Sequence, residues 1–463
     1  MNAAERIIRN VAVGAGPPTD ITIRDGKIAT IGARLPKTGL EFDATGMTAL
    51  PGLVDHHIHI LAASARRVSV DLSGLADEKA LITKLRSFAT ARAPGTAIRA
   101  IGYDERAAGL PDATTLDTWL PDYPLRIQDR TGALWLLNAA MLARLGKGLY
   151  PDCVELGDGG VPTGRIWRGD AWLRDRLGTE MPDIAALAQE LVSHGITGVT
   201  DTGPSNGPAE ARLFEAAIAR GDWPLQLCLM GHETLPESPH YTRGPLKLHY
   251  DEHALPSLEE VVARISAARV QRRAVAAHCV TEAELVWYLT ALDAAGGARR
   301  GDRIEHGGLI PPVLIGQIAD MGLTVVTNPG FIHGRGDRYL RDIAADQHAD
   351  LYRFRSLLEA GIRIGVGSDA PYGPYDPWAI IRAARDRRTV QGAMLGCDEA
   401  VSAQNALFAL HYDFSLSRQR SIVAGESADI VLMRGTYRDI LNEPVAERVA
   451  ATIIGARIVH VAR

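Results

Sequence analysis

The chain has 463 residues, of which 46% are hydrophobic, and its formal net charge is -5. A chain of this length and composition can bury a large core, which excludes a disordered protein, and its mild negative charge does not support nucleic acid or a membrane surface as a partner. The N-terminal MNAAERIIRN has no apolar signal-peptide core and the four cysteines are scattered, so we expect a cytoplasmic protein without disulfides or a thiolate zinc site.

The two ends of the chain predict one small domain. Residues 1–48 and 420–463 are rich in β-branched residues and turns, and we expect them to pair as a β-sandwich. The main domain is predicted at 49–419. Its first strand is LPGLVDHHIHI, residues 50–60.

Residues 61–182 are predicted as an insertion after that strand. The pattern of apolar residues indicates a helix, a strand and a second helix, at 76–93, 124–129 and 134–146. A segment of this length exceeds an ordinary barrel loop, so we expect a lid over the active site. Tyr103 and Trp135 are its candidate substrate-binding residues.

From about residue 190 the chain alternates between short β-branched runs and longer stretches with helical spacing. The runs begin at residues 195, 224, 244, 274, 303, 324 and 363. Strand–helix alternation is typical of parallel βαβ units, and eight strands predict a (β/α)8 TIM barrel. A doubly wound open sheet is the structural alternative, but it would require a glycine-rich phosphate turn, and no convincing G-x-G-x-x-G is present.

The first candidate metal ligands lie in VDHHIH. His57 and His59 are two residues apart on a predicted strand and therefore point to the same face, together with Asp55. With 14 histidines in the chain, an H-x-H spacing arises by chance about 0.4 times, so the pair alone is a weak signal.

Further candidates follow later strands. His278 ends AVAAH, His306 ends RIEH and Asp369 ends RIGVGSD, all near the carboxyl ends of their strands, where barrel enzymes place catalytic groups. Taken singly, each is more simply a core or capping residue. Together with the histidine pair they indicate a site for a divalent metal.

Lys247 is the next candidate. In GPLKLHYD the alternation turns Lys247, His249 and Asp251 inward. A lysine inside a barrel is costly unless it is paired or chemically altered. A neutral amine can react with CO2, and the resulting carbamate could bridge two metals. A salt bridge, or a place at the solvent-exposed mouth, is the simpler alternative.

These residues resemble the amidohydrolase superfamily. PGLVDHHIH, the lysine strand, two histidine strands and GSDAP carry this likeness. GYDE, LPDATTLD, PLRIQDRTGALWLLN and VPTGRIW resemble its YtcJ-like branch, amidohydrolase family 3. The resemblance implies one metal held by His57, His59 and Asp369. A second would be held by His278 and His306, and carboxylated Lys247 would bridge the two.

One position departs from the family pattern. Many relatives have a histidine after the glycine of the segment that precedes the tryptophan, and here Ala133 follows Gly132. If that histidine touches substrate in relatives, the substrate of this protein differs.

The predicted activity is hydrolysis of a C–N bond in an amide, cyclic amide, carbamate or urea, with Asp369 as the catalytic proton carrier. One or two divalent ions are expected per chain. Nitrogen and oxygen ligands suit zinc first, and manganese, iron or cobalt also fit. The predicted partner is a small-molecule substrate, with no nucleic acid and no membrane, and a homo-oligomer remains open.

Two other functions stay open. The first is a one-metal deaminase of a heterocycle, although deaminase branches place a glutamate three residues after the strand-five histidine, where this chain has Thr281. The second is a non-enzymatic scaffold, which the complete ligand set disfavours. The substrate remains undefined. Candidate contacts at the barrel mouth are Arg335 and Tyr339, in a predicted loop at 331–342, and Tyr372.

Overall fold

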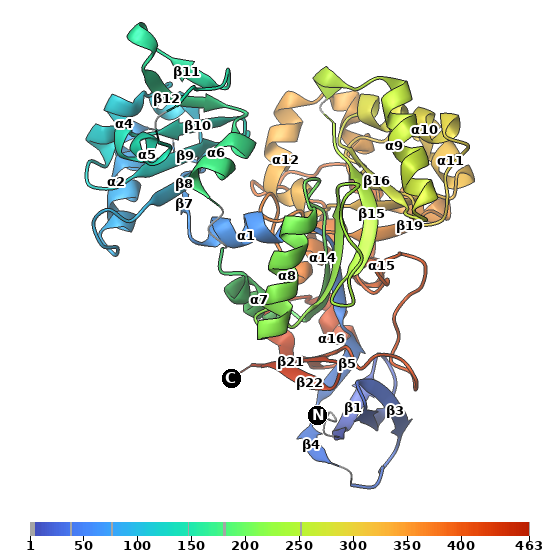
Figure 1. The fold of residues 1–463 in the computed structure, drawn as a ribbon. Coiled ribbons are helices and arrows are strands. Elements are labelled where there is room, and N and C mark those ends of the chain that lie inside the picture. Colours follow the sequence, from blue (N-terminus) through green and yellow to red (C-terminus); the bar gives the residue numbers. More distant parts are fainter. Residues whose placement is uncertain are drawn as a thin grey trace. The chain divides into compact units, whose positions relative to one another are not determined.

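The computed structural model describes residues 5–37, 39–75, 77–146, 148–178, 182–250 and 252–462, so Asp251 lies outside the described residues. The chain divides into two compact units (Figure 1). One combines Met1–Ile60 with Ile184–Arg463, and the other is Leu61–Asp183. Within the described ranges, no helix is both long and apolar enough to cross a membrane.

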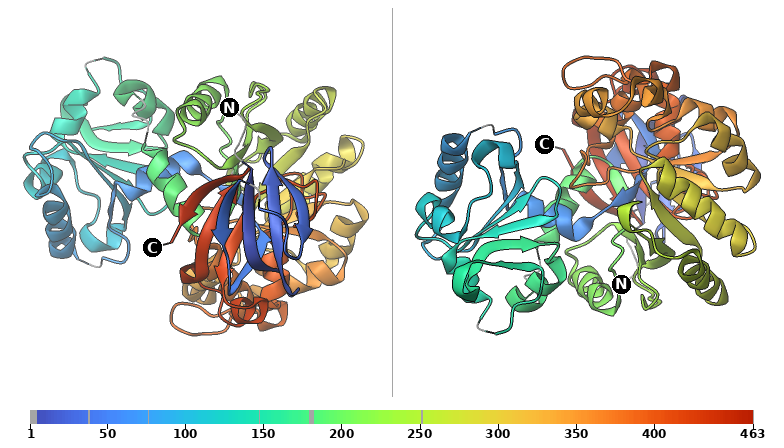
Figure 2. Two further views of the ribbon diagram at one scale, coloured as in Figure 1. Left: turned by 90° about the horizontal axis from the view of Figure 1, so that it is seen from below. Right: turned by 90° about the horizontal axis from the view of Figure 1, so that it is seen from above.

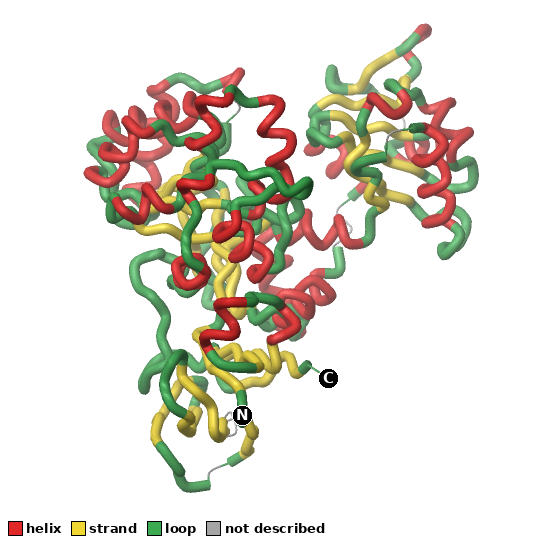
Figure 3. The backbone as a smooth tube through the Cα atoms, turned by 180° about the vertical axis from the view of Figure 1, so that it is seen from behind, coloured by secondary structure: helices red, strands yellow, loops and turns green. Residues whose placement is uncertain are grey.

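A parallel sheet of eight strands forms the centre of the first unit. Each strand of this sheet is hydrogen-bonded to the strand of the same sheet that follows it in sequence. Helices surround the strands (Figure 3). The strands are β6 (Leu53–Ile58), β13 (Ile196–Asp201), β14 (Gln226–Gly231), β15 (Thr242–Leu248), β16 (Val275–Cys279), β17 (Arg303–His306), β18 (Thr324–Thr327) and β19 (Arg363–Val366). All eight strands predicted for the barrel are present.

The sheet closes between its first and last strands through a few backbone hydrogen bonds just beyond β19. The Asp369 amide donates to the His57 carbonyl over 2.7 Å, and the His59 amide donates to the Ala370 carbonyl over 2.9 Å. Gly367 permits this approach, because a Cβ atom there would lie 2.7 Å from the backbone nitrogen of His57.

The barrel helices begin where the sequence supplies caps. Ser257 and Glu260 form a capping box at α9 (Leu258–Val270), and Thr281 and Glu284 form one at α10 (Glu282–Ala294). The other helices of this unit are α7 (Ile184–Ser193), α8 (Pro208–Arg220), α11 (Pro312–Asp320), α12 (Gly330–Asp342), α13 (Arg355–Glu359), α14 (Pro377–Asp386), α15 (Ala403–Ala409) and α16 (Tyr437–Asn442).

The prediction of a loop at 331–342 is wrong, because these residues form helix α12. Phe331 and Ile332 at its start are buried in a cluster with Tyr352, and Tyr339 and Leu340 pack against the same cluster two turns later. This spacing gives the helix one apolar side despite its glycines and charges.

The apolar spacing of HADLYRFRSLLEAG predicts one of the barrel helices at 348–361, but the structure does not form a single helix there. A 3₁₀ helix at Ala345–Asp350 is followed by a break and then by α13. At the break Tyr352 has φ +44°, and the Arg353 guanidinium pairs with Glu399 at 2.6 Å. The Glu399 carboxylate also accepts hydrogen bonds from the backbone amides of Phe354 and Ser356, so side-chain contacts replace the helix at this point.

Both ends of the chain contribute to one further sheet (Figure 2). Its order is β22-β21-β20-β5-β1-β2-β3, with β4 also paired to β1. The strands are β1 (Arg6–Val13), β2 (Pro18–Arg24), β3 (Lys27–Gly32), β4 (Leu40–Asp43), β5 (Met47–Pro51), β20 (Ile430–Arg434), β21 (Val449–Ile454) and β22 (Arg457–Val461). Because β5 pairs with β20, the two termini share this sheet. A two-layer sandwich stays a prediction.

The second unit has a sheet and cores of its own. The sheet order is β11-β12-β10-β9-β8-β7, and one apolar cluster packs this sheet against α2 and α4. Its elements are α1 (Ile60–Arg67), β7 (Val70–Asp71), α2 (Glu78–Ala89), β8 (Ile98–Tyr103), α3 (Glu105–Ala108), α4 (Ala113–Trp119), β9 (Leu125–Asp129), β10 (Leu134–Leu137), α5 (Ala139–Arg144), β11 (Val154–Leu156), β12 (Pro162–Trp167) and α6 (Asp170–Leu177).

The helix predicted at 134–146 is correct only in its second half. Residues Leu134–Leu137 form strand β10, which pairs with β9 and β12. The helix starts after Asn138, whose side chain accepts a hydrogen bond from the Met141 amide and so caps α5.

Candidate functional site

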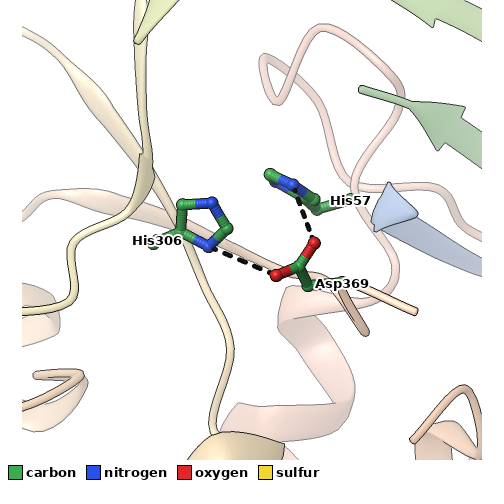
Figure 4. A group of neighbouring side chains, drawn as sticks. All are labelled: His57, His306 and Asp369. Carbon is green, nitrogen blue, oxygen red and sulfur yellow. Dashed lines mark ion pairs between the residues drawn. The ribbon is translucent and has the colours of Figure 1, made fainter. Parts of the chain in front are cut away.

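Three buried side chains converge at the carboxyl end of the barrel. His57 comes from β6, His306 ends β17 and Asp369 follows β19, and one potential ligand atom of each lies within 4.8 Å of the others (Figure 4). The Nε2 atom of His57 is 3.4 Å from one Asp369 oxygen, and the Nδ1 atom of His306 is 4.0 Å from the other. Three protein ligands of this kind are typical of catalytic zinc sites.

Two other predicted ligands lie beside this group. The Nε2 atom of His59 is 3.1 Å from Asp369, and its side chain is 22% exposed, so it marks the side that solvent can reach. The ring centroid of His278 is 4.6 Å from that of His306. The structure therefore brings the four predicted histidines and Asp369 together.

Hydrogen bonds orient the two buried imidazoles of this group. Glu305 pairs with Nδ1 of His57, and the Asn328 side-chain oxygen accepts from Nδ1 of His306 over 2.8 Å. A hydrogen bond at Nδ1 leaves the Nε2 lone pair for a metal. The His57 Nε2 atom is buried and makes no hydrogen bond within the described residues, as expected of an atom that binds a metal ion.

The backbone turns two of these residues toward the site. His306 has φ +71° and Asp369 has φ +51°, a left-handed conformation that is uncommon for residues other than glycine. Simple alternation along β17 would turn His306 to the same side as Ile304. The turn of the backbone at the end of the strand instead directs its ring toward His57, at a centroid distance of 4.5 Å.

Glu305 is a site residue that the sequence analysis missed. Its buried carboxylate contacts His57 through one oxygen and Arg303 through the other. The Lys247 amine is 3.9 Å away. Burial alone would raise the pKa of Glu305, but Arg303, Lys247 and His57 hold that pKa well below its usual range. The signal was the R-x-E spacing, which puts two ionisable side chains on the inner face of β17.

The charge states of three groups in this cluster suit metal ligation. His57 differs, because burial would lower its pKa but the Glu305 and Asp369 carboxylates raise it. Burial lowers the pKa of His306 to about 3, and burial also lowers the pKa of His278. Burial would raise the pKa of Asp369, yet His57 and His59 keep it well below its usual range. Neutral imidazoles and an ionised carboxylate are the forms that bind a metal.

Lys247 lies on the inner side of β15, as predicted. It is buried, and burial lowers the pKa of its amine although the Glu305 carboxylate raises it. Its nitrogen makes no hydrogen bond in the described part of the chain.

The predicted substrate contacts fall in different places. Tyr372 is next to His59, with ring centroids 5.9 Å apart, and Arg335 donates to the Tyr372 carbonyl. The Tyr339 hydroxyl is 3.1 Å from that of the buried Tyr352. Tyr103 and Trp135 belong to the second unit. There the Tyr103 hydroxyl donates to the Gly109 carbonyl over 2.8 Å, and the Trp135 indole donates to Asp170 over 2.9 Å.

The chain is similar to known hydrolases. The model of the amidohydrolase family matches residues 40–460. The chain is 26% identical over 492 residues to N-substituted formamide deformylase of Arthrobacter pascens, covering 89% of each protein. It is 23% identical over 406 residues to YtcJ of Bacillus subtilis (strain 168), which is named an amidohydrolase, covering 75% of each.

The fold has a counterpart among solved structures. An uncharacterized metal-dependent hydrolase from Pyrococcus horikoshii OT3 matches with a TM-score of 0.77 and 18% identity, covering 94% of this chain and 98% of that one. At this identity the likeness shows a shared fold.

Proposed function

The chain belongs to the amidohydrolase family, and from that premise we propose that it is a metal-dependent hydrolase of a C–N bond in a small amide, cyclic amide, carbamate or urea. The observation that carries the proposal is the convergence of His57, His306 and Asp369 at the carboxyl end of the barrel. The name of the Arthrobacter relative, an N-substituted formamide deformylase, supports a C–N bond as the target.

The donor set suits one or two divalent ions. His57, His59 and Asp369 would hold one ion, and His278 and His306 would hold a second. Nitrogen and oxygen donors favour zinc, and manganese, iron or cobalt also fit. The buried His57 Nε2 atom, which has no hydrogen bond among the described residues, supports this fit.

A bound divalent ion supplies a water whose pKa is lowered toward 7. Asp369 is then the proton carrier. Its ionised carboxylate would accept a proton from the attacking water and return it to the leaving nitrogen. Glu305 and Asn328 would hold the His57 and His306 rings in the orientation that this chemistry needs.

We further propose that Lys247 carries a carbamate. The amine would attack CO2, forming an N–C bond and releasing a proton, and the product would supply a singly charged carboxylate with two donor oxygens. Burial of the amine supports the reaction, because it favours the neutral form. The alternative is an ammonium that pairs with Glu305 across 3.9 Å.

Deamination is less well supported. Thr281, three residues after His278, caps helix α10 and offers no carboxylate. Glu284 is engaged at the same helix start, where its carboxylate accepts from the amides of Val280 and Thr281. Glu282 is exposed on the first turn of the helix. Among the described residues, neither of these two glutamates after His278 is thus placed to move protons onto a ring.

The test is metal removal combined with substitution of Lys247. Chelation and desalting should abolish hydrolysis across a panel of amides, and added zinc, manganese or cobalt should restore it. Lys247→Ala should lose at least one metal, measured by elemental analysis, and most of the activity. Lys84→Ala, which changes an exposed lysine of α2, is the control.

Full activity in a metal-free preparation would refute the proposal. Normal metal content and a normal rate in Lys247→Ala would refute the carbamate. That result would instead favour a one-metal deaminase.

A further inference from the structure

A half-buried arginine beside the metal ligands has no acidic partner in the described part of the chain. Arg335 lies on α12, which follows β18 at the catalytic end of the barrel. Its guanidinium carbon is 3.9 Å from the centre of the Phe331 ring. Its Nη2 atom donates to the Tyr372 carbonyl oxygen over 3.1 Å. These two contacts fix the plane of the guanidinium, while Nε and Nη1 make no hydrogen bond with any described residue.

Tyr372, which accepts the hydrogen bond from Arg335, is itself part of the site. The Tyr372 amide donates to the Asp369 carbonyl over 2.7 Å, and the Tyr372 ring stands edge-on to His59. The buried Tyr352 hydroxyl experiences both charges: burial raises its pKa well above the usual range, Asp369 raises it further and Arg335 lowers it. Arg335 and Asp369 therefore act on the same buried hydroxyl.

The neighbouring arginines of α12 are satisfied differently. Arg338 is exposed and pairs with Asp342 at 2.9 Å, and Arg341 donates to the Asp337 carbonyl over 2.9 Å. Arg335 differs from Arg338 in having its charge oriented but not neutralised by a described acidic group. Because the whole chain has a formal net charge of -5, an anionic substrate would need such a local cation.

We propose that Arg335 binds a carboxylate of the substrate, so that the enzyme selects amides bearing a carboxylate next to the scissile C–N bond, such as N-acyl amino acids. The proposal rests on the proposed hydrolase function. A guanidinium held at two points can present its remaining N–H groups to a carboxylate, which is planar and accepts two hydrogen bonds.

The experiment compares two substrates that differ only in the carboxylate. N-acetylphenylalanine carries it, and N-acetylphenethylamine lacks it. The metal-loaded full chain should hydrolyse the acid with the higher kcat/KM. Arg335→Gln should lower kcat/KM for the acid roughly 10- to 100-fold, mainly through KM, and change that of the neutral amide by less than about two-fold.

Two further variants separate binding from structure. Arg338→Gln, on the same helix, should leave both substrates unaffected. Arg335→Lys keeps the charge and should recover part of the loss. Equal losses of kcat/KM on both substrates in Arg335→Gln would mean that Arg335 only supports α12. A wild-type preference for the neutral amide would also overturn the proposal.

Calorimetric binding of N-acetylphenylalanine distinguishes this failure from failure of the hydrolase function. If the acid binds and loses affinity in Arg335→Gln, but the wild type hydrolyses neither this acid nor any compound of the amide panel, the anion site stands and the hydrolase proposal fails. If the acid does not bind to the wild type, the anion site is refuted.

Discussion

A single carboxylate organises the buried side of the candidate site. Glu305 contacts His57 and Arg303 and faces Lys247, so it fixes one imidazole and offsets the positive charge of Arg303. A carboxylate behind a ligating histidine orients the ring and raises the basicity of its free nitrogen. Glu305 acts through His57 and is a positioning residue.

Replacing Glu305 with Gln should therefore weaken metal binding more than it alters the fold of the barrel. Neutralisation leaves Arg303 without its anion, and the contact from residue 305 to His57 loses its charge. We expect an apparent metal affinity lower by about 10- to 100-fold, measured by competition with a chelating dye. Addition of excess zinc should recover part of the activity.

Glu284→Gln is the matched control for this change. Glu284 is also a buried glutamate, but its carboxylate caps α10 by accepting from the amides of Val280 and Thr281. The Glu284→Gln substitution should lower the melting temperature without changing metal affinity. Unchanged metal affinity in Glu305→Gln would contradict the positioning role.

The residues of the site were predictable to different degrees. The grouping of His57, His59 and Asp369 follows from strand alternation and from the carboxyl-end rule for barrels. The orientation of His306 does not, because its positive φ reverses the alternation at the last residue of β17. Glu305 could have been found from the same alternation, since it places both Arg303 and Glu305 on the inner face.

At the level of elements, the barrel strands were predicted more reliably than the segments around them. Buried parallel strands are short apolar runs, and such runs are visible in the sequence. Helix α12 was missed because Gly330, Gly334 and Gly336 lower its intrinsic helix propensity. Burial of Phe331 and Ile332 against Tyr352 outweighs that cost, and tertiary packing of this kind is not encoded locally.

Closure of the barrel depends on the absence of a side chain at Gly367. Gly367→Ala would force a methyl group against His57 and disturb the hydrogen bond from the Asp369 amide. We expect a loss of about 1–3 kcal/mol in the free energy of unfolding, measured by urea denaturation, together with weaker metal binding.

Gly316→Ala provides the comparison. Gly316 lies in α11, and a Cβ atom there would meet no heavy atom within 4 Å. This change should be neutral or stabilising by about 0.5–1 kcal/mol, because alanine is the better helix former. Equal stability of the two variants would show that the barrel tolerates separation of β6 from β19.

At the scale of the whole molecule, the two units differ in how they are assembled. The first needs both ends of the chain, because β5 pairs with β20. The pairing of the two termini was predictable, because both are rich in β-branched residues and turns. The sheet of the insertion was not, because only one of its six strands was predicted and Leu134–Leu137 has the composition of a helix.

The second unit should fold without the rest of the chain. Its apolar clusters are made of its own residues, and Trp119 and Leu116 are fully enclosed within one of them. A polypeptide of residues 61–183 should unfold cooperatively in urea. Tryptophan fluorescence measures this transition. Leu116→Ala should lower its stability by about 2–5 kcal/mol. A gradual transition that Leu116→Ala leaves unchanged would contradict this expectation.

The closure of the barrel also determines when the site can exist during synthesis. The Ser368 amide donates to the Asp55 carboxylate, and these partners are 313 residues apart in the chain. At about 5–20 residues per second, a ribosome needs roughly 15–60 s to reach the second partner after making the first. The nascent chain thus presents its histidine pair long before Asp369 is available, whereas the second unit is complete by Asp183. The insertion can fold while translation continues, and the metal site is completed only near the end of translation.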